Sequence, residues 1–398
     1  MIGGGAAGFF AAINIAERQP SWKIAILERG NDILTKVRVS GGGRCNVTHA
    51  EFVPKELSQN YPRGEKELLG PFHKFMTGDT IEWFEKRGVE LKIEEDGRMF
   101  PVSNSSQSII DCFVSLAHKY KVQILKNQSV KTLQENDGEW LVTTKSDNFQ
   151  GKKIVMTTGS NPKIWKILEE LGHSIIPPVP SLFTFNIKDD RINELPGIST
   201  QVSVQVVSET NNVVLESEGP LMVTHWGFSG PAILKLSAWG ATELHRMNYN
   251  FMIRVNWLYD WSMDAVVERL KEEKSSRGKQ TMYKYAQFDL PKRLWHSLLG
   301  AAGISKSLKW GEASNIVLQN LSLQLTESYF KVEGKSTFKE EFVTAGGVDL
   351  KEVNFRTFNS KIYPTLYFAG EVLNIDAITG GFNFQNAWTG AYIVAQSV

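Results

Sequence analysis

The segment that most constrains the fold is the opening stretch MIGGGAAGFFAA, in which Gly3, Gly5 and Gly8 have the spacing G-x-G-x-x-G. This spacing is typical of the turn between a buried strand and a helix in dinucleotide-binding folds. The following residues, FFAAINIAER, have helical apolar spacing, and the buried strand IAIL then leads to Glu28, 20 residues after Gly8. A carboxylate there accepts hydrogen bonds from a ribose, while the glycine turn and the helix N-terminus hold the pyrophosphate.

Both ends of the chain are expected to be incomplete. Only Met1 and Ile2 precede the turn, so the first strand is expected to be very short, and the final AYIVAQSV has the pattern of an interrupted helix.

Other segments favour FAD as the nucleotide. The Glu28 carboxylate disfavours the 2′-phosphate of NADP. A second glycine run lies in TKVRVSGGGRCNVTH (35–49), where three glycines among cationic residues predict an anion site, the alternative being a flexible loop. Near the C-terminus, strand LYFAG, Glu371, Gly380-Gly381 and a helix return the chain to the nucleotide. NAD sites are usually contained in one unit, so contacts from both chain ends favour the longer FAD.

Composition excludes several classes of protein. The net charge of +1 gives no global preference for nucleic acid or membrane. Cys45 and Cys112 form no C-x-x-C pair, and the seven histidines have no metal-ligand spacing, so we expect no metal. No apolar run is long enough to span a membrane. We expect a cytoplasmic protein, and no oligomeric state is predicted.

The predicted organisation is a Rossmann-like α/β FAD-binding domain with a β-meander, split by an inserted domain. Strands VQILKNQSVKTLQ, EWLVTTK and KKIVMTTGS form the meander, with a hairpin turn at Asp137-Gly138. Short alternating strands, QVSVQVV, NNVVLESEG and PLMVTHW, then predict a small barrel or sandwich, followed by helices. We therefore expect FAD-binding segments at 1–185 and 336–398, and an inserted β-rich and helical substrate domain at 186–335 that caps the flavin. The alternative is a continuation of the FAD domain.

Several of these stretches resemble the HI0933-like family of FAD-dependent oxidoreductases, also described as aminoacetone-oxidase-like or BaiN-like. The resemblance covers essentially the whole chain and is carried by GGGAAGFFAA, SGGGRCNVT and AGEVLNIDAITGGFNFQNAWTGAYIVA. The chain departs from the family in its short first strand, in TTGS at 157–160 and in Phe384.

The resemblance implies a set of FAD contacts. Those expected at the pyrophosphate, the adenosine ribose, the adenine and the flavin end are Gly3, Gly5, Ala6, Ala7, Glu28, Lys36, Ser40, Gly42, Arg44, Cys45, Val130, Gly370, Glu371, Gly381, Phe382 and Asn383. For Cys45 we expect a packing role near the flavin and no disulfide chemistry.

Three further features are weighed against plain structural roles. His225 in THWGFSGP and Arg98 in GRMFPVSNSSQS are candidate catalytic or substrate-binding residues, although a turn and a salt bridge would explain them equally well. The stretch 274–296 has six cationic residues against Asp289 alone, interleaved with four aromatic residues. That pattern is typical of RNA binding, the alternative being a solvated loop over packed aromatics.

The expected activity is hydride transfer through flavin N5, with transient NAD(P)H or O2 as the redox partner and a small-molecule substrate. The resemblance also implies an alternative, a flavin-dependent reductase of uridine in ribosomal RNA. A hypothesis from another class is a flavin-binding sensor without turnover.

Overall fold

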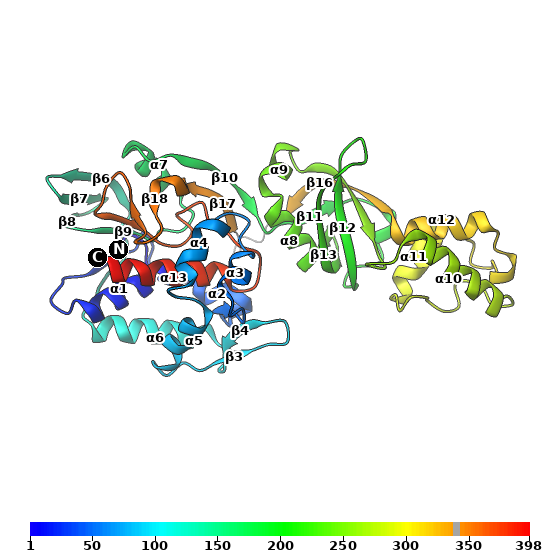
Figure 1. Cartoon of the computed structure of the whole chain (residues 1–398), viewed down its shortest axis with the longest axis horizontal. Helices are drawn as coiled ribbons and strands as arrows, with labels where there is room; N and C mark the ends of the chain where they lie inside the picture. Colours follow the sequence, from blue (N-terminus) through cyan, green and yellow to red (C-terminus); the bar gives the residue numbers. More distant parts are fainter. Residues whose placement is uncertain (337–342) are drawn as a thin grey trace. The chain divides into compact units, whose positions relative to one another are not determined.

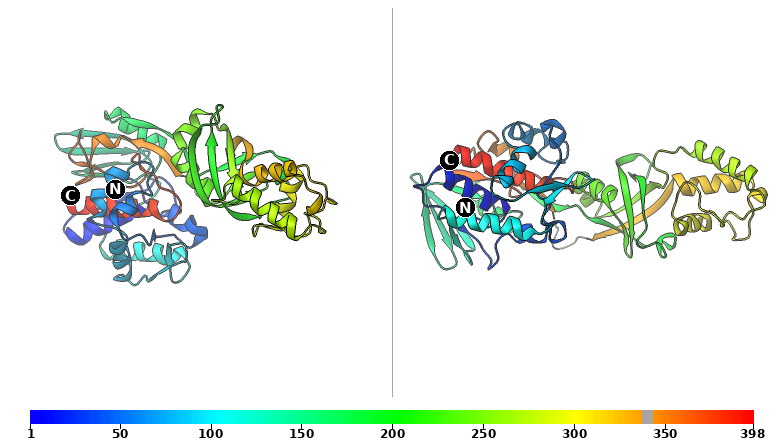
Figure 2. Two further views of the ribbon diagram at one scale, coloured as in Figure 1. Left: turned by 45° about the vertical axis from the view of Figure 1, so that its right-hand side comes forward. Right: turned by 90° about the horizontal axis from the view of Figure 1, so that it is seen from below.

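The computed structural model describes residues 1–336 and 343–398 (Figures 1 and 2). The chain divides into two compact units, Met1–Pro180 with Lys339–Val398, and Ser181–Phe338. The predicted insertion at 186–335 begins five residues after the start of the second unit. Residues 337–342, which belong to the expected third segment, lie outside the described residues.

A mixed sheet with parallel central strands forms the centre of the first unit. Ile2 pairs in parallel with both Leu27 and Met156, so the strand expected before the glycine turn is a single residue. Its amide donates to Val155 O at 2.9 Å, and the Gly3 amide donates to Leu27 O at 2.9 Å. Ile2 thereby joins the parallel pair β1–β5 to the strand row β9–β20–β19–β18. The bounds are β1 Ala25–Leu27, β5 Gln123–Leu125, β9 Ile154–Met156, β18 Val353–Asn354, β19 Asn359–Ser360 and β20 Leu366–Phe368.

Helices from the two ends of the chain pack against each other beside this sheet. Figure 1 shows α1 (Ala6–Arg18) next to α13 (Phe382–Ser397). Phe10 of α1 lies 5.3 Å from Trp388 of α13, between ring centroids, and both side chains are fully buried. The glycine turn before α1 and the glycine pair before α13 therefore belong to one packed unit. The other helical segments of this unit are α2 Thr35–Gly43, α3 Pro54–Ser58, α4 Glu65–Phe72, α5 Thr77–Glu85, α6 Ser106–Lys119, α7 Pro162–Glu170 and η3 Leu350–Glu352.

Three smaller sheets complete the first unit. The predicted meander forms β6 Val130–Asn136, β7 Glu139–Thr144 and β8 Asn148–Gly151. Its first turn has positive φ at both Asp137 and Gly138, which matches the twist of a two-residue hairpin. The other sheets are β2–β4–β3, with bounds Thr48–His49, Arg98–Pro101 and Leu91–Ile93, and β10–β17, with bounds Ile175–Ser181 and Val343–Val348.

The second unit contains a closed six-stranded barrel, which decides between the two architectures expected there. One expectation was wrong: NNVVLESEG and PLMVTHW do not form two strands. They form one continuous strand, because pairing with β12 runs without a break through Val202↔Gly219 and Gln201↔Pro220. In order around the barrel, the strands are β11 Thr184–Ile187, β14 Gly227–Ser229, β13 Val213–Thr224, β12 Ser199–Val207, β15 Asn250–Asn256 and β16 Ser328–Ser336.

The second unit also contains helices, and α10, α11 and α12 form a group at one end of the barrel (Figure 1). Trp295 and Trp310 are fully buried in this group, with ring centroids 6.5 Å apart. The bounds in the second unit are η1 Asp190–Ile192, α8 Pro231–Trp239, α9 Ala241–Arg246, α10 Met263–Ser276, α11 Lys292–Ala301, η2 Trp310–Glu312 and α12 Asn315–Thr326. No helix in the described ranges is both long and apolar enough to cross a bilayer.

Candidate functional site

The three glycines of the N-terminal turn have three different environments. Gly3 has φ +112°, and an added Cβ would lie 2.4 Å from Thr157 O. At Gly8 an added Cβ would lie 2.0 Å from Gly3 O, so the helix packs on the turn too closely for any side chain. At Gly5 an added Cβ would meet nothing within 4 Å. The turn is thus closed toward the protein and open on the side where a ligand would approach.

The first turn of α1 is built to receive an anion. Its N-cap is Gly5, and no side chain caps the helix. The unpaired amides and the positive end of the helix dipole therefore face the open side of Gly5. Ala6 and Ala7 supply two of these amides without a bulky side chain. This arrangement fits a pyrophosphate.

Glu28 follows β1 and lies directly beside the turn. Its two carboxylate oxygens accept the backbone N–H groups of Gly4 and Gly30, each at 2.8 Å. The side chain is half-buried. The predicted ribose-binding carboxylate therefore lies next to the predicted pyrophosphate site, as an adenosine diphosphate moiety requires.

The second glycine run interrupts α2. Gly41, Gly42 and Gly43 all have positive φ, and Ser40 is extended. An added Cβ at Gly41 would lie 2.7 Å from the Phe100 ring, whereas one at Gly42 would meet nothing within 4 Å. Like the first turn, this loop packs on one side and is open on the other.

Arg44 and Cys45 face different surroundings. The Arg44 guanidinium pairs with Glu94 at 2.6 Å and lies 3.9 Å from the centre of the Phe100 ring. Cys45 is fully buried, and burial raises the pKa of its thiol to about 12. The lowered pKa of a reactive thiol is therefore absent, and the side chain packs in the core.

The C-terminal segment reaches the same region from the other end of the chain. Lys36 Nζ lies 2.5 Å from Glu371 Oε2, joining residues 335 positions apart. Asn383 accepts the Ala377 amide at 3.1 Å and donates to the Ala377 carbonyl at 3.3 Å. At Gly381 an added Cβ would lie 2.5 Å from Thr48 O. The contacts of Lys36 and Thr48 hold the loop between Glu371 and α13 against the two ends of the segment 35–49.

Three predicted positions remain to be placed: Gly370, Val130 and Phe382. Gly370 has φ +77°, and its Cβ would lie 3.4 Å from Ala7. Val130 is buried at the start of β6. Phe382 begins α13, and its carbonyl accepts the Tyr61 hydroxyl at 2.6 Å.

His49 was not among the predicted site residues, although it directly follows SGGGRCNVT. Its ring stacks on Phe382 at 4.5 Å, and its Nδ1 lies 3.1 Å from Gly380 O. Because a carbonyl only accepts, Nδ1 carries the proton in this contact. The imidazole therefore holds the glycine pair before α13 in place through a hydrogen bond to Gly380 and stacking on Phe382.

The two catalytic candidates lie in different units, Arg98 beside the second glycine run and His225 in the barrel unit. Arg98, in β4, pairs with Asp96 at 2.7 Å and with Glu94 at 3.7 Å, which is the salt-bridge role weighed above. His225 lies in the exposed turn between β13 and β14 of the second unit. Within the described residues, no group of acidic, histidine and cysteine side chains could hold a metal ion.

In the fold, two of the six cationic side chains in the basic stretch 274–296 are engaged by other groups of the protein. Lys274 donates to the Ala313 carbonyl at 2.6 Å, and Arg277 pairs with Glu273 at 2.6 Å. Four exposed cationic residues have no carboxylate partner among the described residues: Lys279, Lys284, Lys292 and Arg293. Of the four aromatic residues, only Tyr285 is exposed (52%), and Lys284 lies 5.1 Å from its ring.

Comparison with known proteins agrees with this geometry. The HI0933-like protein Rossmann domain family matches residues 1–397. The ribosomal RNA dihydrouridine synthase of Haemophilus influenzae is 30% identical over all of this chain and 97% of its own length. The 3-dehydro-bile acid delta(4,6)-reductase of Clostridium scindens is 24% identical over all of this chain and 98% of its own length.

A solved structure has a similar fold. The 3-ketosteroid delta1-dehydrogenase of Sterolibacterium denitrificans has a TM-score of 0.51 and 10% identity, covering 99% of this chain and 98% of that one. The expected Rossmann-like FAD-binding fold with a β-rich insert is thereby confirmed. The match over almost every residue, with the turn, carboxylate and converging chain ends described above, shows that this protein belongs to the HI0933-like family of FAD-dependent oxidoreductases.

Proposed function

We propose that this FAD-dependent oxidoreductase reduces the C5–C6 double bond of uracil in RNA, with NAD(P)H as the electron source. The observation that carries the proposal is the set of four exposed cationic residues without carboxylate partners in a protein of net charge +1. Their side chains suit a phosphate backbone, and the exposed ring of Tyr285 suits a base. The name of the full-length Haemophilus influenzae relative supports the same substrate.

In this proposal the first unit holds FAD. The α1 amides hold the pyrophosphate, Glu28 holds the ribose, and the Gly42 loop with the Glu371–Gly381 loop holds the flavin end. When bound, FAD supplies hydride transfer. The proposed set of cofactor contacts is Gly3, Gly5, Ala6, Ala7, Glu28, Lys36, Ser40, Gly42, Arg44, Cys45, Val130, Gly370, Glu371, Gly381, Phe382 and Asn383.

The net reaction adds one hydride and one proton across C5–C6 and oxidises NAD(P)H to NAD(P)⁺. The second unit acts as the substrate domain, and its cationic residues neutralise phosphates. Four phosphate contacts on a single strand give a log–log salt slope of about −2.8. Binding would therefore weaken about fiftyfold between 50 and 200 mM salt.

A second candidate is reduction of a small-molecule enone. The similarity to the Clostridium scindens bile acid reductase favours it. Uracil and an unsaturated ketone both have a carbon–carbon double bond conjugated to a carbonyl, so one hydride-transfer site suits either substrate.

The test combines turnover with flavin reduction. FAD-loaded protein is incubated with NADH or NADPH and an unmodified ribosomal RNA transcript, and the nucleosides are then analysed by mass spectrometry for dihydrouridine. A parallel reaction contains a steroid dienone. Dihydrouridine in the first reaction supports the proposal, product only in the second supports the small-molecule candidate, and a flavin that no donor reduces supports a sensor.

A charge variant separates RNA binding from flavin chemistry. Changing Lys279, Lys284, Lys292 and Arg293 to Gln should abolish most RNA turnover and leave flavin reduction by NAD(P)H unchanged. A control variant carries Gln at four exposed lysines of the first unit, Lys55, Lys66, Lys131 and Lys145. Equal RNA turnover by the two variants would contradict the proposed role of the cationic residues.

A further inference from the structure

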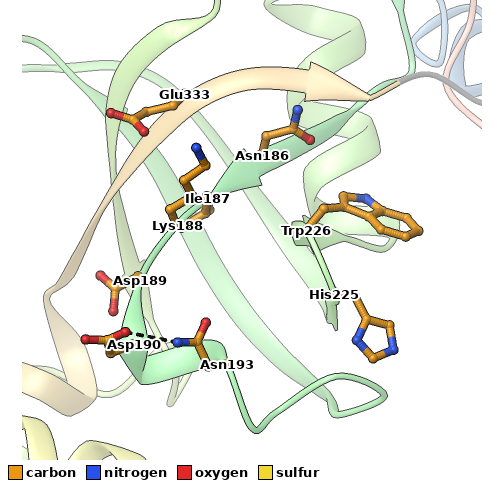
Figure 3. Close-up of a pocket in the computed structure, with 9 residues that line it drawn as sticks. All are labelled: Asn186, Ile187, Lys188, Asp189, Asp190, Asn193, His225, Trp226 and Glu333. Carbon is orange, nitrogen blue, oxygen red and sulfur yellow. Dashed lines mark hydrogen bonds between the residues drawn. The ribbon is translucent and has the colours of Figure 1, made fainter.

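We propose that a pocket on the outside of the barrel binds one unstacked base of the RNA, with the base against Trp226 and the adjoining phosphates over the start of α11. This proposal rests on RNA being the substrate. The pocket has a volume of about 690 Å³ and lies entirely within the second unit. Its lining residues, drawn in Figure 3, are Asn186, Ile187, Lys188, Asp189, Asp190, Asn193, His225, Trp226 and Glu333.

Trp226 forms an aromatic platform on a fixed backbone. It lies in the two-residue turn that joins β13 to β14, where Thr224 pairs with Gly227. Its carbonyl accepts the Ile187 amide at 2.9 Å, and an added Cβ at Gly227 would lie 2.1 Å from Phe185 O. The turn is therefore held tightly against β11, while 42% of Trp226 remains exposed. An exposed indole on a fixed backbone gives a base a surface on which to stack.

Polar groups around the indole offer both donors and acceptors. The Asn186 side-chain oxygen accepts the Ser336 hydroxyl at 2.9 Å, so its NH₂ group is available for a ligand. One Asp190 oxygen accepts the Asn193 NH₂ group at 2.9 Å, which leaves the other oxygen and the Asn193 carbonyl as acceptors. Figure 3 shows Trp226 and His225 on one side of the pocket, and Asp190 and Asn193 across from them. This combination suits the edge of a nucleobase.

The charges of the pocket favour a neutral group. Asp189 pairs with Arg191 at 2.7 Å. Glu333 pairs with Lys331 at 2.8 Å. Lys188 and Asp190, the remaining charged lining residues, are opposite in sign. The lining side chains themselves have a formal charge of −2, one lysine against three carboxylates, and Arg191 and Lys331 outside the lining pair with two of these carboxylates. An uncharged base therefore suits the pocket better than a phosphate.

Two cationic side chains, at the start of α11, lie beside this pocket. The short helix η1 includes Asp190 of the lining and also carries α11, because Ser297 donates to Arg191 O at 2.5 Å. Arg293, in the first turn of α11, donates to Glu194 O at 2.9 Å, one residue after the lining residue Asn193. Lys292 precedes it and is exposed. A strand whose base enters the pocket would therefore carry its phosphates over Lys292 and Arg293.

The experiment measures binding of the full-length, FAD-loaded protein by fluorescence anisotropy. The probes are a labelled oligouridine of about 12 nucleotides and an abasic ribose-phosphate chain of the same length. Trp226→Ala should weaken oligouridine binding about tenfold and leave abasic binding and the salt slope unchanged. Trp226→Phe should restore most of the affinity. The matched control is Trp239→Ala, at the end of α8, which is 41% exposed and should bind like the wild type.

Three results would overturn the pocket proposal: equal oligouridine binding by Trp226→Ala and the wild type, an equal loss on both probes, or wild-type protein that binds neither probe. The assay needs no turnover, so it is independent of the proposed activity. Dihydrouridine formation with no effect of Trp226→Ala would refute the pocket alone. Trp226-dependent binding without dihydrouridine would refute the activity alone.

Discussion

Replacing Glu28 with Ala tests the assignment of the adenosine end of the cofactor. Glu28 already accepts the amides of Gly4 and Gly30 at 2.8 Å each, so the change removes two hydrogen bonds to a half-buried carboxylate. We expect a loss of about 2 kcal/mol in the unfolding free energy of the FAD-free protein. In a domain of this size that lowers the Tm by about 4–8 °C.

The same change should also weaken FAD binding. A charge-assisted hydrogen bond to the ribose contributes about 1.5–3 kcal/mol, so the Kd for FAD should rise roughly tenfold to a hundredfold. Flavin fluorescence titration of the apoprotein measures the Kd, and calorimetry without FAD measures the Tm. The control is Glu135→Ala, since Glu135 also accepts a turn amide, from Gly138 at 2.8 Å, but lies in the meander. A Glu28→Ala variant with the Kd of the control would show that the ribose lies elsewhere.

Four further predictions follow from the same unit. Acid release and chromatography of the bound cofactor should give FAD, and recovery of FMN alone would contradict the use of the adenosine site. Cys45→Ala should keep at least a tenth of flavin reduction by the best donor, because the thiol pKa near 12 leaves no thiolate at neutral pH; loss of reduction with FAD still bound would contradict a packing role. Gly8→Ala should abolish FAD retention, since its Cβ would lie 2.0 Å from Gly3 O, and a variant that purifies with stoichiometric FAD would refute that packing. Burial lowers the pKa of His173, although Glu352 lies 3.1 Å from its ring. The contribution of neutral His173 to the unfolding free energy should therefore be fully present above about pH 6.5 and be lost as the pH falls through the lowered pKa. The Tm of His173→Gln should depend less on pH than that of the wild type, and an equal pH dependence would contradict this role of His173.

The parts of the site that sequence reasoning located depend on local backbone requirements. The positions of Gly3 and Gly8 are fixed by contacts closer than any Cβ permits, so their spacing is visible in the sequence. Glu28 follows from the same logic, because a strand of fixed rise places its end beside the turn. The hairpin at Asp137-Gly138 was equally predictable, since positive φ at both positions selects those residues.

The parts that sequence reasoning missed depend on partners far along the chain. Arg44 pairs with Glu94, 50 residues away, and no local sequence pattern predicts that pair. His49 braces Gly380 only because β2 and the start of α13 meet in the folded unit. The merging of two expected strands into β13 has a similar cause: Gly219 and Pro220 have the composition of a turn, but β12 offers a full-length partner that keeps the strand extended.

The fold also changes the meaning of the basic stretch. By sequence it has a local charge of +5 with four aromatic residues, a pattern spread evenly over 23 positions. In the structure Lys274 and Arg277 are engaged by the protein, and three of the aromatic rings are wholly or partly buried. What remains is a smaller set of four exposed cations, of which Arg293 contacts the residue next to the pocket lining. A near-neutral protein can bind RNA in this way because phosphates respond to local charge within about 10 Å, the screening length at moderate salt, and not to the net charge of the whole molecule. Charge would then determine how tightly the strand is held, while the indole and amides of the pocket would determine which base is accepted.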